Sequence, residues 1–225
     1  MKNTLVNHLT QLLVLILPLM AGCTTLLSKQ PLQTTYYTLE RAESKPQLEP
    51  ALNTHNKLPT LIITMPKAAP GYDTRRMMYT RAPYQLEYFA RSEWIDAPAE
   101  MLRPLMISAI EKTGAFNAVL AKQNQVASDI RLESEVIKLV QDFSTKPSHV
   151  QFTLKASFVD SVNQQVIATK EFNERVNANG DNPIGGVQAA NVAINLALDK
   201  LSVFSNQTMN NWLQSQEKLK KNVAN

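Results

Sequence analysis

Cys23 is the only cysteine in this 225-residue chain, and the residues before it suggest what its thiol does. The stretch Leu19-Met20-Ala21-Gly22 comes directly before it and follows an apolar run. Small residues at this place suit a peptidase that cuts before the cysteine, after which the thiol and the new amino group can carry acyl chains. The sequence therefore predicts that Cys23 is a lipid attachment site, and it predicts no cofactor apart from this covalent lipid.

Residues 1–22 have the features of a signal peptide. Lys2 supplies a positive start, no acidic residue precedes Cys23, and the apolar core runs from about Leu9 to Met20. This core is too short to cross a bilayer, which needs roughly 20 apolar residues. Together with the cysteine, the pattern resembles a bacterial lipobox in which methionine stands where leucine is usual. A transmembrane anchor or a buried core helix is the alternative.

The residue after the predicted acylation site bears on which membrane holds the protein. Thr24 stands at this position. The sorting rule of Gram-negative lipoproteins distinguishes aspartate at this position from all other residues. A residue other than aspartate favours the outer membrane under that rule. We therefore expect a lipid-anchored protein that faces the periplasm, at the outer membrane rather than the inner membrane.

Charge limits the kinds of partner that this chain can have. Once Lys2 is removed with the signal peptide, 22 of the 23 basic residues and all 19 acidic residues remain. A surface dedicated to nucleic acid would need clustered Lys and Arg, so we expect no nucleic-acid partner. The basic cluster of Lys218, Lys220 and Lys221 is explained more readily as a solvated chain end.

The length after cleavage is enough for one good hydrophobic core, so we expect a single domain. Residues 23–34 are predicted to form a lipidated tether, and residues 35–215 a single α+β domain. Within that domain, residues 41–59 are rich in Pro, Glu, Asn and Lys without an apolar period, which indicates a flexible loop. Residues 216–225 are predicted to be a polar basic tail.

Alternating apolar and polar residues predict most of the strands. The cleanest alternation is Val150–Phe158, and a turn at Asp160–Gln165 leads into its return strand. Alternation breaks at Ile137–Val140, which predicts a bulge. The expected strands are Tyr36–Leu39, Leu61–Met65, Met77–Thr80, Gln85–Ala90, Phe116–Leu120, Ile130–Val136, Val150–Phe158 and Val166–Val176.

Apolar residues at helical spacing predict two helices. The first contains Leu102, Met106 and Ile110, with Asp96 as its expected N-terminal cap and Pro104 as an awkward interior residue. The order of strands and helices predicts an α+β fold. We expect a two-layer sandwich, in which a mainly antiparallel sheet carries both helices on one face.

The second helix is predicted from about Ile184 to Trp212. Small residues fill much of its apolar stripe, which lets it pack close to a sheet. Gly185 and Gly186 predict that its first turn is loose or that the helix starts a residue or two later. The expected buried stripe is Val187, Ala190, Ile194, Ala197, Leu201 and Phe204.

Sequence motifs for catalysis are absent. The chain has no HExxH, CxxC, GxSxG, GxGxxG or GxxxxGK[ST] motif, and His55 and His149 do not form a two-histidine pattern. The acidic pair Glu133 and Glu135 fits the wet face of a strand better than a catalytic pair. We therefore expect no metal site and no enzymatic activity.

Aromatic and arginine residues are concentrated in one window of the chain. Tyr and Arg at a surface suit contact with another protein. The alternative is that about half of these aromatic side chains fill the core beneath the first helix. The candidate partner-docking residues are Tyr72, Arg75, Arg76, Tyr79, Tyr84, Tyr88 and Trp94.

The same window resembles a known family. The stretches Pro70–Tyr79 and Pro83–Ala90, followed by Trp94, Pro98 and the helix that ends at Thr113–Phe116, resemble the ABC-type transport auxiliary lipoprotein family. The resemblance implies a non-catalytic lipoprotein that accompanies an ATPase, a permease and a substrate-binding protein with a mammalian-cell-entry (MCE) domain. It also implies transport of phospholipids or other hydrophobic molecules between the inner and outer membranes.

Two other functions stay open from the sequence. The protein could be a free-standing periplasmic lipid carrier with its own apolar cavity between sheet and helices, or a structural lipoprotein of envelope assembly. The expected partners are the MCE-domain protein with its permease and ATPase, and the membrane through the lipid anchor. A homo-oligomer is a further option.

Overall fold

The structure is a computed structural model that describes residues 33–42, 58–121 and 128–223. The predicted signal peptide, Cys23 and all but the end of the predicted tether lie outside the described residues. Most of the loop predicted at 41–59 also lies outside them. The predictions for these segments therefore stay predictions.

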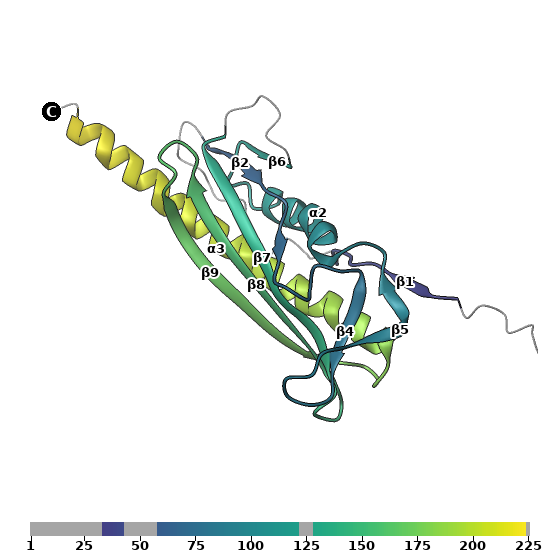
Figure 1. Ribbon diagram of the computed structural model, residues 1–225. Helices are drawn as coiled ribbons and strands as arrows, with labels where there is room; N and C mark the ends of the chain where they lie inside the picture. The colour runs from purple at the N-terminus through teal and green to yellow at the C-terminus, as the bar shows by residue number, and fades with distance from the viewer. Residues whose placement is uncertain (1–32, 43–57, 122–127, 224–225) are drawn as a thin grey trace, which may run out of the picture. The chain divides into compact units, whose positions relative to one another are not determined.

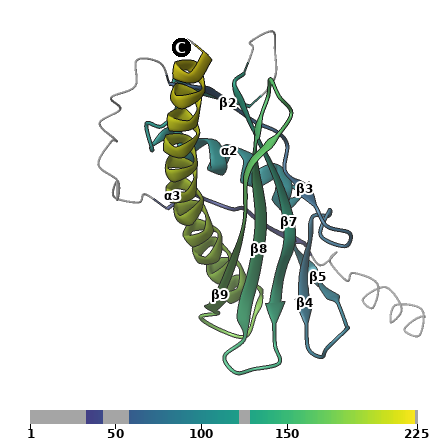
Figure 2. The same ribbon diagram turned by 90° about the vertical axis from the view of Figure 1, so that its left-hand side faces the viewer.

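The folded unit begins at Thr35 and has two layers, a sheet and the helices that cover one of its faces (Figures 1 and 2). This arrangement confirms the predicted α+β two-layer sandwich. The helices of the described residues are α2 (Pro98–Glu111) and α3 (Pro183–Val223). The strands are β1 (Thr35–Tyr37), β2 (Thr60–Ile63), β3 (Lys67–Ala68), β4 (Arg76–Thr80), β5 (Glu87–Trp94), β6 (Ala118–Leu120), β7 (Ile130–Asp142), β8 (His149–Asp160) and β9 (Val166–Asn177).

Strand β7 is the centre of the sheet because it is hydrogen-bonded along both edges. One edge pairs with antiparallel β8 over its whole length, and β8 pairs in turn with antiparallel β9. The other edge pairs successively with β2, β3 and β4, all parallel to β7. The register pairs along this second edge include Leu61 with Ile130, Lys67 with Glu135 and Tyr79 with Gln141.

The long antiparallel strands match the predicted meander. The register of β7 against β8 shifts between Val136 and Lys138, which confirms the bulge expected near Ile137. The predicted hairpin is also present, since β4 and β5 pair antiparallel. The parallel pairings were not predicted. They join segments that are far apart in the chain, and such pairing leaves no local sequence pattern.

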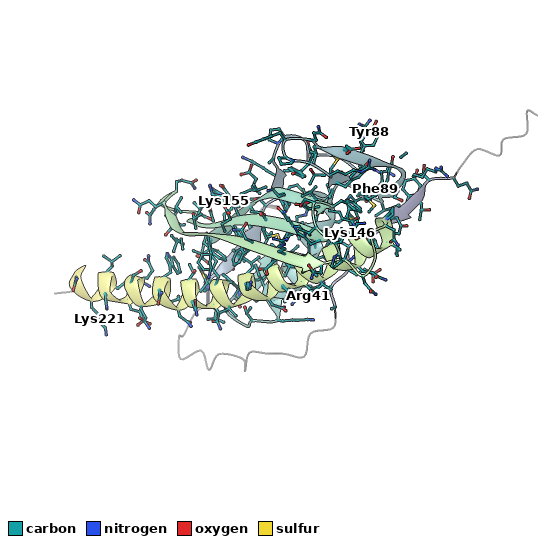
Figure 3. All side chains as sticks on the ribbon, turned by 90° about the horizontal axis from the view of Figure 1, so that it is seen from below. Arg41, Tyr88, Phe89, Lys146, Lys155 and Lys221 are labelled. Carbon is teal, nitrogen blue, oxygen red and sulfur yellow. The ribbon has the colours of Figure 1, made fainter. Side chains whose placement is uncertain are left out.

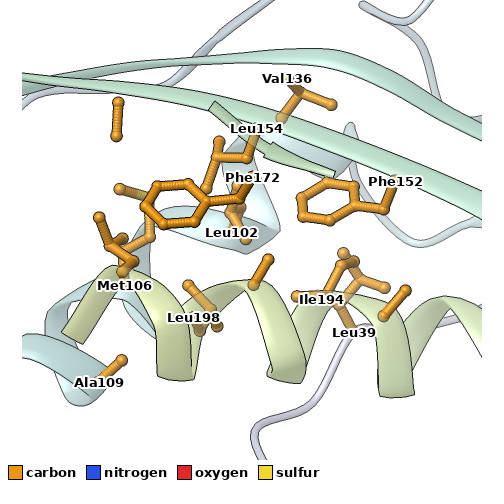
Figure 4. Close-up of a cluster of buried hydrophobic side chains, with 14 of the residues drawn as sticks. Leu39, Leu102, Met106, Ala109, Val136, Phe152, Leu154, Phe172, Ile194 and Leu198 are labelled. Carbon is orange, nitrogen blue, oxygen red and sulfur yellow. The ribbon is translucent and has the colours of Figure 1, made fainter. Parts of the chain in front are cut away.

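Small residues on α3 bring this helix close to the sheet. Ala190, Ala193 and Ala197 are almost completely buried, and so are Ile194 and Leu198. They pack against Phe152, Leu154 and Phe172 of β8 and β9, with α2 contributing from the side (Figure 4). The predicted stripe is confirmed, and its partly buried member Phe204 stacks beside Phe158 and Phe172.

The start of α2 differs from the prediction. Helix α2 begins at Pro98 after Ala97, and no side chain caps it, so the expected cap by Asp96 is wrong. Proline suits the first helical position because its missing N–H would have no partner there. Pro104 lies inside the helix and has no N–H to donate to a carbonyl of the preceding turn. Because Pro104 is exposed, water can donate to that carbonyl instead.

The start of α3 corrects a second prediction. The helix begins at Pro183, and its first turn is not loose, because the two glycines allow close contacts. A Cβ atom on Gly185 would lie 2.2 Å from the backbone oxygen of Gly180, and one on Gly186 would lie 2.1 Å from Oε1 of Gln141. The helix also continues past Trp212, so residues 216–223 of the predicted tail are helical.

Two asparagines one turn apart on α3 hold the extended segment that follows β1. Asn191 accepts a hydrogen bond from the N–H of Glu40 (2.7 Å) and donates to the carbonyl of Thr38 (3.3 Å). Asn195 accepts from the N–H of Ala42 (3.0 Å) and donates to the carbonyl of Glu40 (2.9 Å). The two side-chain amides thus bond this segment as a neighbouring strand would.

We expect Gly185→Ala to lower the free energy of unfolding by about 1–3 kcal/mol, the usual cost of forcing atoms into a packed site. The clash is with backbone, which cannot move aside as a side chain can. Chemical denaturation of the purified domain measures the effect, with Gln188→Ala, at an exposed position of the same helix, as the control. Increased stability in Gly185→Ala, as helix propensity alone would give, would contradict the close contact.

We expect the double variant Asn191→Ala/Asn195→Ala to lose about 2–6 kcal/mol of unfolding free energy, because it removes four hydrogen bonds to this segment that contribute about 0.5–1.5 kcal/mol each. It should also expose residues 38–42 to faster proteolysis. Asn210→Ala is the matched control: it removes an α3 amide for which the described residues provide no hydrogen-bond partner. Equal stability and equal cleavage rates in the two variants would rule out the role of the amides.

Candidate functional site

The outer surface of the β4–β5 hairpin carries paired arginine and tyrosine side chains. The guanidinium carbon of Arg76 lies 4.2 Å from the centroid of the Tyr88 ring, and that of Arg75 lies 5.2 Å from the Tyr36 ring. Tyr36 comes from β1, which pairs parallel to β5. We call Tyr36, Arg75, Arg76 and Tyr88 the arginine–tyrosine face.

The arginine–tyrosine face is exposed and lies on the side of the sheet away from α3. Tyr36 is 51% exposed and Tyr88 is 50% exposed, and both arginines are exposed. Figure 3 shows Tyr88 on this side and Arg41 beside α3 on the opposite side. A cation over an aromatic ring at an exposed site is favourable by about 0.5–1 kcal/mol. This contact orders long side chains before any partner arrives, which lowers the entropy cost of binding.

Tyr79 and Trp94, two of the predicted docking residues, are buried. Tyr79 is 8% exposed, and its ring packs against Phe89 and Phe143 at centroid distances of 4.6 and 5.6 Å. Its hydroxyl donates to Glu87 Oε2 (2.9 Å), and this hydrogen bond together with burial raises the pKa of Tyr79. Trp94 is 4% exposed in the main core. Both side chains are therefore buried beneath the exposed surface of the β4–β5 hairpin.

Tyr72 and Tyr84 occupy other positions on the surface. Tyr72 lies in the turn before β4, where its N–H donates to the carbonyl of Ala69 (3.0 Å), and partial burial raises the pKa of its hydroxyl. Tyr84 is fully exposed at the tip of the β4–β5 hairpin, with φ at 66°. The predicted set therefore divides into the arginine–tyrosine face, a buried support, the hairpin tip and Tyr72 in the turn before β4. Tyr36 was missed because its pairing with β5 is not local.

A small cavity lies between the sheet and α3 in the part of the chain that the structure describes. It lies among Met77, Phe89, Trp94, Leu139 and Ala190 and has a volume of about 20 Å³. A space of this size holds about one water molecule. A lipid carrier of the expected kind would need room for an acyl chain between these layers, and this cavity does not provide it.

One buried histidine resembles part of a catalytic arrangement. His149 Nδ1 lies 3.1 Å from Thr145 Oγ1, and its Nε2 lies 3.5 Å from Asp142 Oδ2. His149 is only 1% exposed, so a substrate cannot reach its imidazole, and burial lowers the pKa of His149. The contacts of His149 with Thr145 and Asp142 stabilise the β7–β8 hairpin.

Searches for metal ligands and for membrane spans give negative results for the residues that the structure describes. Within these ranges, His, Cys, Asp and Glu side chains do not gather in groups of three or more that could hold a metal ion. Neither α2 nor α3 is long and apolar enough to cross a membrane.

Solved structures with a similar fold include the following two. XCC0632 from Xanthomonas campestris is 20% identical, with a TM-score of 0.70 over 80% of this chain and 99% of that one. An uncharacterized protein is 11% identical, with a TM-score of 0.58 over 76% of this chain and 97% of that one. At these identities the likeness concerns the fold alone. A search of curated proteins gives no significant match.

The sequence profile of a known family covers most of the chain. The profile described as ABC-type transport auxiliary lipoprotein component matches residues 37–202. This range contains Arg75, Arg76 and Tyr88 and the whole β4–β5 hairpin. It confirms the resemblance seen in the sequence, and the chain belongs to the ABC-type transport auxiliary lipoprotein component family.

Proposed function

We propose that this protein is a non-catalytic, lipid-anchored subunit of an ABC/MCE-type system that moves phospholipids or other hydrophobic molecules between the inner and outer membranes. Its folded head docks the MCE-domain protein that accompanies the permease and the ATPase. Membership of the transport auxiliary family supports this role. The observation that carries the docking proposal is the exposed and ordered arginine–tyrosine face.

The anchor in this proposal is acyl lipid on Cys23, at the outer membrane. Each buried methylene of an acyl chain contributes about 0.8 kcal/mol, and stable anchoring takes more than one chain. The tether of about 12 residues from Cys23 to Thr34 extends at most about 40 Å. The head therefore stays close to the bilayer, at a height where it can meet a partner that spans the periplasm.

The arginine–tyrosine face has the chemistry of a protein-binding surface. Tyr and Arg are enriched among the residues that dominate binding energy at protein interfaces. Arg76 lies over the Tyr88 ring, and it presents a guanidinium that suits a carboxylate of the partner. The small interior cavity gives less support to the alternative of a free-standing lipid carrier.

We expect Cys23→Ala to abolish incorporation of labelled palmitate and to remove the protein from the outer-membrane fraction. The thiol is the acceptor of the first lipid, so its loss prevents both lipidation and cleavage. Thr25→Ala, two residues further on, is the control and should behave as wild type. Palmitate on the alanine variant, or its unchanged recovery with the outer membrane, would refute acylation at this cysteine.

We expect Arg76→Ala and Tyr88→Ala each to reduce capture of the MCE-domain protein by about tenfold or more, since truncating a dominant interface residue costs more than about 1.4 kcal/mol. Affinity capture from detergent-solubilised envelopes, with quantification of the MCE protein, permease and ATPase, measures this. Lys155→Ala removes an exposed charge from β8 and is the control.

Normal capture by both face variants, or equal loss in the Lys155 variant, would contradict docking through this face. Stoichiometric lipid recovered with the wild-type protein in the absence of these partners would favour the lipid carrier instead.

A further inference from the structure

The tip of the β4–β5 hairpin presents apolar and aromatic groups to solvent. Tyr84 is fully exposed, Leu86 is 44% exposed, and Pro83 between the strands is also exposed. Tyr84 adopts a left-handed backbone conformation, with φ at 66°, which is uncommon for a bulky residue. The tip projects away from the core, and it is separate from the arginine–tyrosine face.

Cations lie beside this tip. The neighbouring β7–β8 loop ends at the same edge of the sheet, because the N–H of Phe143 donates to the carbonyl of Thr80 (2.8 Å). Arg81 and Lys146 are exposed in these two loops, and Glu87, 3.9 Å from Arg81, offsets part of the charge of Arg81. Tyrosine favours the boundary between water and lipid, and exposed cations are attracted to anionic headgroups. This end of the sheet therefore has the composition of a membrane-contacting surface.

The length of the tether allows the lipid anchor to reach a bilayer at this end. Strand β1 runs parallel to β5, with Thr35 opposite Ser92, so the first residue of β1 lies beside the strand that leads back to the hairpin tip. The strand from Ser92 back to Glu87 spans about 17 Å. A tether of about 12 residues extends to about 40 Å, so it can pass the tip and reach a bilayer that the tip touches.

The opposite end of the folded unit offers a rival surface. Leu219 is 57% exposed near the end of α3, beside Lys218, Lys220 and Lys221. Helix α3 spans about 54 Å from Pro183, near the hairpin end, to Leu219. Figures 1 and 3 show this end of α3 far from β4 and β5. Asn191 bonds the segment that follows β1, and it lies about 42 Å along α3 from Leu219, which is as far as the whole tether could extend.

We infer that the tip, Pro83–Leu86, contacts the headgroup region of the bilayer that holds the lipid on Cys23. This inference rests on the proposed lipid anchor and adds an orientation to it. With the tip on the membrane, β5 rises from the bilayer and places the arginine–tyrosine face above the headgroups. Docking then takes place at a fixed height rather than on a freely rotating head.

The test uses the full-length lipidated chain in vesicles of phosphatidylethanolamine and phosphatidylglycerol, with or without brominated acyl chains. Tyr84→Trp places a fluorescent probe at the tip, and Leu219→Trp places a matched probe at the other end. Both positions are exposed, so both variants should fold, and Leu86→Trp serves as a second tip probe. Subtracting the wild-type signal removes the contribution of Trp94 and Trp212.

We expect brominated lipid to reduce the added fluorescence of Tyr84→Trp at least about twofold and to leave that of Leu219→Trp unchanged. A protein that floats with the vesicles but shows no quenching at residue 84 or 86 would overturn the orientation while leaving the anchor intact. Quenching at residue 219 instead would establish the opposite orientation. Failure of the wild-type chain to float with the vesicles would overturn both the anchor and the inference.

Discussion

The hydrogen bonding of β7 along both edges is the constraint on which the rest of this structure depends. A strand with β8 on one side needs partners for its N–H and C=O groups on the other, since unpaired backbone groups in a sheet are costly. Residues 60–80 provide these partners in three short parallel pieces. The last piece is β4, so the pairing of Tyr79 with Gln141 fixes where the β4–β5 hairpin stands. The arginine–tyrosine face and the hairpin tip both take their positions from that register.

The local parts of this fold could be predicted from the sequence, whereas the parts that depend on distant pairing could not. Alternation in Val150–Phe158 and the break after Val136 correctly predicted a strand and a bulge, because both depend on neighbouring residues. Small residues on α3 correctly predicted a helix packed on a sheet. Gly185 was misread, because its need for a small side chain comes from Gly180 in the preceding loop and not from its own helix.

The candidate site was recognised by residue type, but its burial could not be predicted. Tyr79 and Tyr88 look equivalent in the sequence, yet one is in the core and the other is exposed. The difference arises from the register of β4 against β5, which shifts between Arg76 and Met78 and decides which residues share a face. Tyr36 joins the face only because β1 pairs with β5, far along the chain.

We propose that the arginine–tyrosine face docks an MCE-domain protein in the envelope. The most direct measurement is site-specific photo-crosslinking in cells, with a photoreactive residue in place of Glu93, which lies opposite Arg76 in the hairpin. A second photoreactive residue in place of Gln164, in the β8–β9 turn, provides the reference. Our account predicts a cross-link to the MCE-domain protein from position 93 and none from position 164. Cross-links from position 93 only to other envelope proteins, or the same products from both positions, would contradict it.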